Sequence, residues 1–154
     1  MQKVSCIHEA ILGNRARNPD LLAVSAWDGD LTYLDLDRLS SLLAKYLCAS
    51  GLPPKTIVPL CFEKSKWAIV AVLGVLRAGA AYVFVDPCFP HARMRVICED
   101  IGAWTMLCSA KNIPQAIELV DQPIVVQTVV KETTKDLSAE LPSVKILDPV
   151  YNSK

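Results

Sequence analysis

Two side chains near the middle of the sequence have the types and spacing of metal ligands. Cys88 and His91 lie three positions apart, and thiolate sulfur and imidazole nitrogen both bind zinc. A structural zinc site needs about four such donors, and the sequence contains one further histidine, His8. We therefore expect no metal ion at this pair.

Two arginines just beyond this pair could be read as an anion clamp. Arg93 and Arg95 lie two positions apart, within a segment whose pattern predicts a helix. Side chains two positions apart on a helix point in different directions. A solvated face, or local pairing with Glu99, is therefore the favoured interpretation.

Nucleotide chemistry would need a loop of a different kind. Backbone amides of a glycine-rich loop normally hold the phosphates of a bound nucleotide. The six glycines of this sequence are all isolated, and none follows Gly102. The segment after Phe62 offers Glu63, Lys64 and Ser65, which is a weak signal for a nucleotide or flavin binder. The sequence therefore contains no segment that predicts a phosphate-binding loop.

The cysteines do not form a recognisable framework. They are scattered, four of them lie in apolar runs, and no Cys-x-x-Cys pair occurs. Reduced, buried thiols are the favoured interpretation, with disulfide bridges as the alternative. The six are Cys6, Cys48, Cys61, Cys88, Cys98 and Cys108.

Composition and charge exclude several classes of function. The 154 residues are 52% hydrophobic and 21% charged, which suits one α/β domain or subdomain. Sixteen basic residues balance sixteen acidic ones without a basic cluster, so we expect neither nucleic acid nor a membrane as a partner. Residues 1–13 lack the apolar core of a secretory signal, so we expect a cytoplasmic location.

The elements that would position these residues are clearest between residues 56 and 87. Residues 67–76 are apolar except for Gly74 and predict a buried helix, too short to span a membrane. Arg77 and Gly79 are typical of a helix end, since a cation is favourable there and glycine adopts a left-handed cap.

A strand is predicted on each side of this helix. Residues 56–62 and 80–85 are short apolar runs, and Asp86 with Pro87 ends the second one. Strand, helix and strand form a βαβ crossover, which requires the two strands to be parallel.

Periodicity predicts further elements on both sides of this unit. We expect Ile7, Ala10, Ile11 and Ala16 to face inward from a helix at residues 6–17. We expect Thr32 or Asp35 to cap a helix at residues 34–50. The expected elements are a helix at 6–17, a hairpin at 22–33 around Asp28-Gly29, helices at 34–50, 91–102 and 112–120, and strands at 104–108 and 124–130. Residues 131–140 predict a loop or weak helix, residues 144–147 a short strand, and the tail from residue 151 a mobile end.

These patterns carry a family resemblance. The run IVPLCFEKSKWAIVAVLGVLRAGAAYVFVDP at residues 57–87 resembles the second core motif of nonribosomal peptide synthetase adenylation domains, especially fungal ones, in the acyl-adenylate-forming (AMP-binding) superfamily. Upstream, AWDGDLTYLDLDRLSSLLAKYL at residues 26–47 resembles their first core motif. The resemblance covers residues 5–110 well.

The resemblance implies a fold and an activity. The expected fold is α/β, an open and mainly parallel sheet flanked by helices with a short N-terminal β-hairpin. The complete domain would activate an amino acid with ATP and Mg²⁺. In the family, the phosphate loop, the substrate-anchoring and ribose-binding aspartates and the C-terminal lysine lie downstream of the second core motif. We therefore assign no catalytic, cofactor or metal residue and expect no cofactor in this chain.

The positions that match the two motifs are expected to be structural. They are Thr32, Tyr33, Leu36, Arg77, Ala78, Gly79, Tyr82, Asp86 and Pro87. One position departs from the family, which usually has proline where Phe84 stands, so this strand regains a backbone donor and gains a large apolar side chain.

Two hypotheses of function follow. The favoured one is that the chain is the N-terminal part of an adenylating domain, inactive alone, with residues 1–130 as its α/β subdomain and 131–154 as a polar connecting segment. Its partner would be the remainder of that domain. The alternative is a noncatalytic scaffold that docks on a neighbouring condensation domain. An apolar face left open would also favour self-association. Whether the chain is itself an enzyme stays open.

Overall fold

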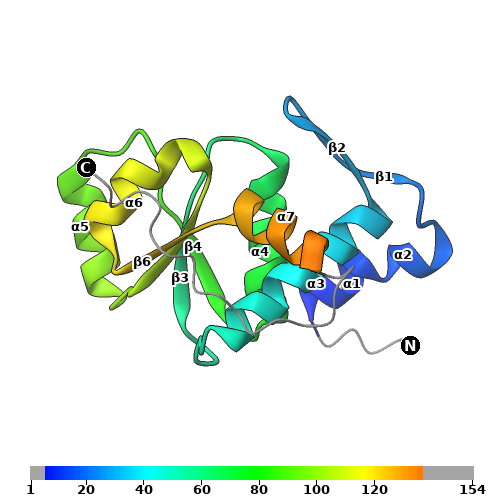
Figure 1. The fold of residues 1–154 in the computed structure, drawn as a ribbon, viewed down its shortest axis with the longest axis horizontal. Helices are drawn as coiled ribbons and strands as arrows, with labels where there is room; N and C mark the ends of the chain where they lie inside the picture. Colours follow the sequence, from blue (N-terminus) through cyan, green and yellow to red (C-terminus); the bar gives the residue numbers. More distant parts are fainter. Residues whose placement is uncertain (1–5, 137–154) are drawn as a thin grey trace.

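The computed structural model describes residues 6–136. Helices lie on both sides of a central sheet, and a small hairpin projects beside it (Figure 1). In chain order the elements are α1 (Ile7–Leu12), α2 (Asn14–Arg17), β1 (Leu22–Ala26), β2 (Gly29–Thr32), α3 (Tyr33–Ala49), β3 (Ile57–Cys61), α4 (Lys66–Arg77), β4 (Ala81–Phe84), α5 (His91–Asp100), β5 (Thr105–Cys108), the 3₁₀ turn η1 (Ala110–Asn112), α6 (Ile113–Leu119), β6 (Gln122–Val125) and α7 (Val126–Asp136).

The main sheet is parallel throughout. Its strand order is β4-β3-β5-β6, and each neighbouring pair runs in the same direction. Leu60 of β3 lies opposite Phe84 of β4 and opposite Leu107 of β5. This confirms the α/β class and the predicted crossover, because α4 connects the parallel neighbours β3 and β4.

The two faces of the sheet bury different cores, because strand side chains alternate between faces. On one face, Leu60, Leu107 and Ile124 pack in a core with side chains of α3, α4 and α7. On the other face, a second core holds Cys61 and Cys108 with side chains of α5 and α6. The molecule therefore has three layers, with α5 and α6 covering one side and α3, α4 and α7 the other (Figure 1).

The hairpin and the long helix after it form as predicted. β1 and β2 pair antiparallel, with Ala26 opposite Gly29. Thr32 caps α3: its Oγ1 accepts from Asp35 N at 3.1 Å, and its own N donates to Asp35 Oδ2 at 3.0 Å. This reciprocal capping box satisfies two backbone donors that the first helical turn leaves unpaired. Thr32 is thus the cap, and Asp35 completes it.

The helix α4 also ends where the sequence predicts. Gly79 has φ of 78°, a left-handed conformation that glycine adopts at little cost, and the chain turns there into β4. Arg77 in the last turn donates from Nη1 to the backbone oxygen of Asp37 at 3.0 Å and to its Oδ1 at 2.8 Å. The motif arginine therefore ties the end of α4 to the first turns of α3.

The first helix differs from the prediction. Residues 6–17 form two short helices that meet at Gly13, and Ile7 is 67% exposed. Ala10, Ile11 and Ala16 are exposed as well. Leu12 is the side chain of α1 that packs on the core, so the helix contributes a single position to it and not the predicted stripe.

The fourth strand is confirmed as β6, but its bounds differ from the expected 124–130. The strand β6 ends at Val125, and α7 begins with the next residue. Val126, Val129 and Val130 have exposures of 0%, 1% and 2%, a spacing of three and four that buries one side of a helix. The residue type of the three valines predicts a strand, because β-branched residues favour strands, but their packing on α3 makes the segment helical.

The helix α7 continues past residue 130, where we expect the polar connecting segment to begin. The division into a subdomain at 1–130 and a connecting segment at 131–154 stays a prediction. The strand expected at 144–147 and the tail from 151 lie outside the described residues. Among the described residues, no helix has both the length and the apolar character needed to cross a membrane.

Candidate functional site

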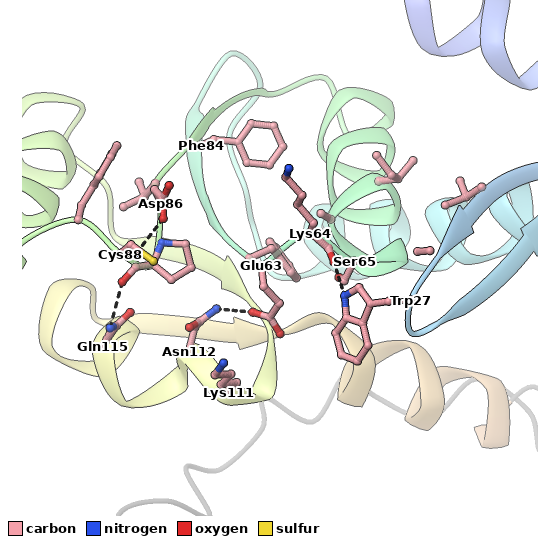
Figure 2. A pocket seen from close by; sticks show the side chains of 18 of the residues that line it. Trp27, Glu63, Lys64, Ser65, Phe84, Asp86, Cys88, Lys111, Asn112 and Gln115 are labelled. Carbon is pink, nitrogen blue, oxygen red and sulfur yellow. Dashed lines mark hydrogen bonds between the residues drawn. The ribbon is translucent and has the colours of Figure 1, made fainter.

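A hollow opens where the parallel strands end. Its volume is about 1160 Å³, and it is lined by the segments that follow β3, β4 and β5, with the β1 strand on one side (Figure 2). Ligands of open α/β sheets bind outside the carboxyl ends of the strands, so this is the part of the fold where a functional site is expected.

Glu63 joins two of these segments. Its Oε2 accepts from Ser109 Oγ at 2.9 Å. The same oxygen accepts from Asn112 Nδ2 at 2.8 Å (Figure 2). Asn112 Nδ2 also donates to the backbone oxygen of Cys61 at 3.2 Å. The carboxylate after β3 therefore fixes the turn after β5, and two nearly buried polar side chains obtain partners.

These contacts determine the charge of Glu63. Partial burial acts to raise its pKa, but hydrogen bonds from its own backbone amide, Ser109 and Asn112, together with the nearby Lys111, outweigh burial and lower the pKa. Glu63 is consequently a carboxylate acceptor near neutral pH. Its Oε2 is committed to this network, and the lowered pKa makes the carboxylate a weaker proton acceptor.

The segment after β4 is held by its own side chains. Asp86 Oδ1 accepts from the backbone amide of Cys88 at 2.8 Å, which is the geometry of an Asx turn. The backbone oxygen of Pro87 accepts from Gln115 Nε2 of α6 at 3.4 Å. The motif pair Asp86 and Pro87 thus lines the hollow and shapes the turn there.

The hairpin closes the opposite side. Trp27 Nε1 donates to the backbone oxygen of Lys64, and Asp28 Oδ1 accepts from the backbone amide of Lys66 at 3.0 Å. The N-terminal end of α4 therefore already holds a carboxylate from within the chain, an arrangement that the helix dipole favours. The hydroxyl of Ser65 is buried beside it without a hydrogen-bond partner among the described residues.

Apolar side chains complete the wall beside β4. Phe84 is 50% exposed, and its ring meets that of Tyr82 edge to face, with centroids 5.5 Å apart. Ile69 of α4, 41% exposed, lines the same hollow. Figure 2 shows the ring of Phe84 above the hollow, with the amine of Lys64 beside it.

The nine motif positions do not form one site. Asp86 and Pro87 line the hollow, whereas Tyr82 lies on the exposed side of β4. The first-motif positions belong to the cap and first turn of α3, where Leu36 is 2% exposed. The remaining positions end α4; they are Arg77, Ala78 and Gly79.

One residue of each candidate pair found in the sequence has another partner. His91 Nε2 lies 3.0 Å from Glu118 Oε2, and the guanidinium of Arg93 lies 4.4 Å from the ring centroid of Phe89. Within residues 6–136, one group could hold a metal ion by proximity; it consists of Cys6, the N-cap residue of α1, with His8 and Glu9 of that helix. This group is far in sequence from the Cys88 and His91 pair.

The hollow by itself does not define a triphosphate site. The helix end that could hold a phosphate is taken by Asp28. The carboxylates Glu63 and Asp86 line the hollow, and so do the cations Lys64 and Lys111. Among the described residues that line it there is no glycine, so no glycine-rich loop holds a phosphate there through its backbone amides. We therefore derive no chemical step from these residues.

Sequence reasoning missed the Glu63 network. Glu63 was considered as part of a weak nucleotide-binding signal, and Ser109 and Asn112 were not singled out. The sequence does indicate these residues by their positions, because each lies within four residues after the end of a predicted parallel strand. The carboxyl ends of parallel strands meet at one edge of the sheet, so residues that follow them lie close together.

Comparisons with known proteins agree with this architecture. Residues 13–150 match the family described as AMP-binding enzyme. Over 139 residues the chain is 42% identical to Nonribosomal peptide synthetase 1 of Aspergillus fumigatus, a match that covers 90% of the chain and 2% of that protein.

Two solved structures are similar to this chain in fold. A structure of the nonribosomal peptide synthetase FmoA3 in its α-methyl-L-serine-AMP bound form is 27% identical, with a TM-score of 0.73, over 80% of this chain and 14% of that one. VinN, at 16% identity, shares the fold with a TM-score of 0.77 over 92% of this chain and 39% of its own. The chain thus spans a small part of each of these relatives.

Proposed function

The chain belongs to the AMP-binding enzyme family, and we propose that it is the N-terminal part of an adenylating domain of a nonribosomal peptide synthetase. In the complete domain an amino acid would be activated with ATP and Mg²⁺. This chain would supply the parallel sheet and the edge on which that site is completed, and it would be inactive alone.

One observation carries the proposal. The chain matches Nonribosomal peptide synthetase 1 of Aspergillus fumigatus at 42% identity over 90% of its own length, yet it spans 2% of that protein. A match over nearly all of this chain and so small a part of the relative supports a contribution to a larger active site. Glu63, Ser109 and Asn112 would fix the segments after β3 and β5 so that the remainder of the domain meets a preformed edge.

The test is a chimera. Residues 1–154 would replace the aligned segment in an adenylation domain of Nonribosomal peptide synthetase 1 of Aspergillus fumigatus, and amino-acid-dependent ATP–pyrophosphate exchange would be measured. We expect exchange by the chimera and none by the chain alone. Exchange by the chain alone, or a folded chimera that binds ATP without exchange, would contradict the proposal.

A matched pair of variants sharpens this test. In the chimera, Glu63→Ala should lower exchange, because it releases the segment after β5 and leaves Asn112 and Ser109 without their acceptor. Glu99→Ala, an exposed residue of α5, should leave exchange unchanged. If the chain is instead a docking scaffold, the chimera should show no exchange, and the chain alone should bind a condensation domain saturably in calorimetry.

A further inference from the structure

The outer edge of β4 offers hydrogen-bonding groups that the described residues leave without a neighbouring strand. The strand β4 is the end strand of the sheet order β4-β3-β5-β6. Its inner side uses alternate residues: Ala81 N donates to Thr56 O at 2.8 Å, and Val85 N donates to Leu60 O at 2.9 Å. In a parallel ladder the intervening residues direct both N–H and C=O the other way. The backbone groups of Tyr82 and Phe84 therefore face outward.

The side chains of these two residues are exposed as well. Tyr82 is 38% and Phe84 50% exposed, and both lie on the same face of the strand. Residues 80–85 carry no charge. Natural edge strands are usually protected by charged residues, proline or a bulge, and this edge has none of these within the strand.

We propose that this edge pairs antiparallel with the β4 strand of a second copy of the chain, about a two-fold axis through Val83. In that register Tyr82 lies opposite Phe84 of the second copy, and the two residues exchange both N–H···O hydrogen bonds. The same exchange occurs on the other side of the axis, so the outward pattern of β4 is self-complementary. The four aromatic rings come together on one face, where cross-strand aromatic pairs are favourable.

Charge also favours the antiparallel direction. Asp86 follows the end of β4, and its Oδ1 accepts from the backbone amide of Cys88 at 2.8 Å. Two antiparallel copies place their Asp86 carboxylates at opposite ends of the strand pair, whereas parallel copies in register bring these like charges together. The interface is one short strand pair, well below the roughly 1,200 Å² of a stable complex, so the dimer should be weak and concentration-dependent.

Cysteine cross-linking tests the register. The chain would carry serine in place of the exposed Cys6, Cys48 and Cys88, together with Val83→Cys. At the axis the two Val83 positions form a non-hydrogen-bonded pair with Cα atoms roughly 4.5 Å apart, within the range of a disulfide. Oxidation with glutathione disulfide should give a covalent dimer. The matched control Ala81→Cys lies opposite Val85 of the second copy, so it should cross-link at least about tenfold more slowly; equal rates would overturn the register.

Sedimentation equilibrium tests the dimer itself. Phe84→Pro removes an outward amide and leaves the inner ladder intact, so it should weaken the dimer at least about tenfold. Tyr82→Lys, which puts a charge on the edge, should do the same and serves if the proline variant does not fold. Val96→Ser on α5, at a position 54% exposed, is the control and should change nothing.

Three outcomes would overturn the proposal. They are a monomer at the highest concentration reached, a dimer that both edge variants leave intact, and a monomer whose Tyr82 and Phe84 amides are protected from hydrogen exchange. The last would mean that a segment of the same chain covers the edge. None of these measurements involves ATP, so the pairing stands or fails independently of the proposed adenylating function.

Discussion

Glu63 is the residue that most directly couples the sheet to the hollow. Its carboxylate accepts from Ser109 and Asn112, which are 1% and 5% exposed and would otherwise be left without this acceptor. Asn112 Nδ2 keeps the backbone oxygen of Cys61 as an acceptor, so the hydroxyl of Ser109 is the donor that depends most on Glu63. A buried donor without a partner is destabilising by about 1–3 kcal/mol.

The charge of Glu63 should make stability depend on pH. Because its folded pKa is lowered below the usual 4.5, the stabilisation is present above pH 4.5 and is lost as pH falls through the folded pKa. We expect Glu63→Gln to reduce the loss of stability between about pH 5 and about pH 3, measured by urea unfolding. The control Glu99→Gln, at an exposed position, should keep the wild-type slope.

The cysteines divide into two reactivity classes. Burial raises the pKa of Cys61 to about 11 and that of Cys108 to about 12, and it also raises the pKa of Cys98. The thiolate is the reactive form, so these three should be inert at neutral pH. The other three cysteines are exposed.

Thiol titration checks this division. With Ellman's reagent at about pH 8, we expect three thiols to react rapidly in the folded chain and all six of the sequence to react in urea. More than three fast thiols would mean that the second core opens readily. Fewer than six in urea would point to a disulfide.

At the scale of elements, α7 shows how packing overrides local preference. Val126, Val129 and Val130 favour a strand by type, yet they lie on the side of α7 that packs against α3 and α4. Three buried valines gain more free energy from this contact than the few tenths of a kcal/mol that each loses in a helix.

A single truncation tests this packing. Val129→Ala removes two methylene equivalents from a side chain that is 1% exposed, and should lower the free energy of unfolding by about 2 kcal/mol. The control Val96→Ala, on a helix at a position 54% exposed, should change stability by less than about 0.5 kcal/mol. Equal effects in chemical denaturation would contradict the position given to α7.

At the scale of the whole molecule, ion pairs connect the N-terminal helices to the layer of α3 and α4. Asp37 accepts from Arg77 Nη1 at 2.8 Å and from Arg15 Nη1 at 2.6 Å. The helices α1 and α2 bury no residue completely, so this exposed link is an important part of their attachment. Exposed ion pairs contribute about 0.2–1 kcal/mol, so the attachment should be weak.

Removing the ion pair between Arg15 and Asp37 should increase local unfolding of the N-terminal helices α1 and α2 alone. Arg15→Gln should speed amide hydrogen exchange across residues 7–17 about two- to fivefold, since that factor corresponds to the free energy of one exposed pair. Exchange in β3 and β5 should not change, because Arg77 still contacts Asp37. Faster exchange throughout the sheet would mean that the N-terminal helices stabilise the whole fold.

The sequence by itself determined the elements whose signals are local. The capping pair Thr32 and Asp35, the end of α4 at Gly79 and the β3-α4-β4 crossover follow from residue type and spacing, because such features depend on neighbours along the chain. Only the tertiary structure decided the rest. It made α7 a helix, broke the first helix at Gly13, and brought Glu63 to Asn112, because these outcomes depend on contacts between segments that chain order does not specify.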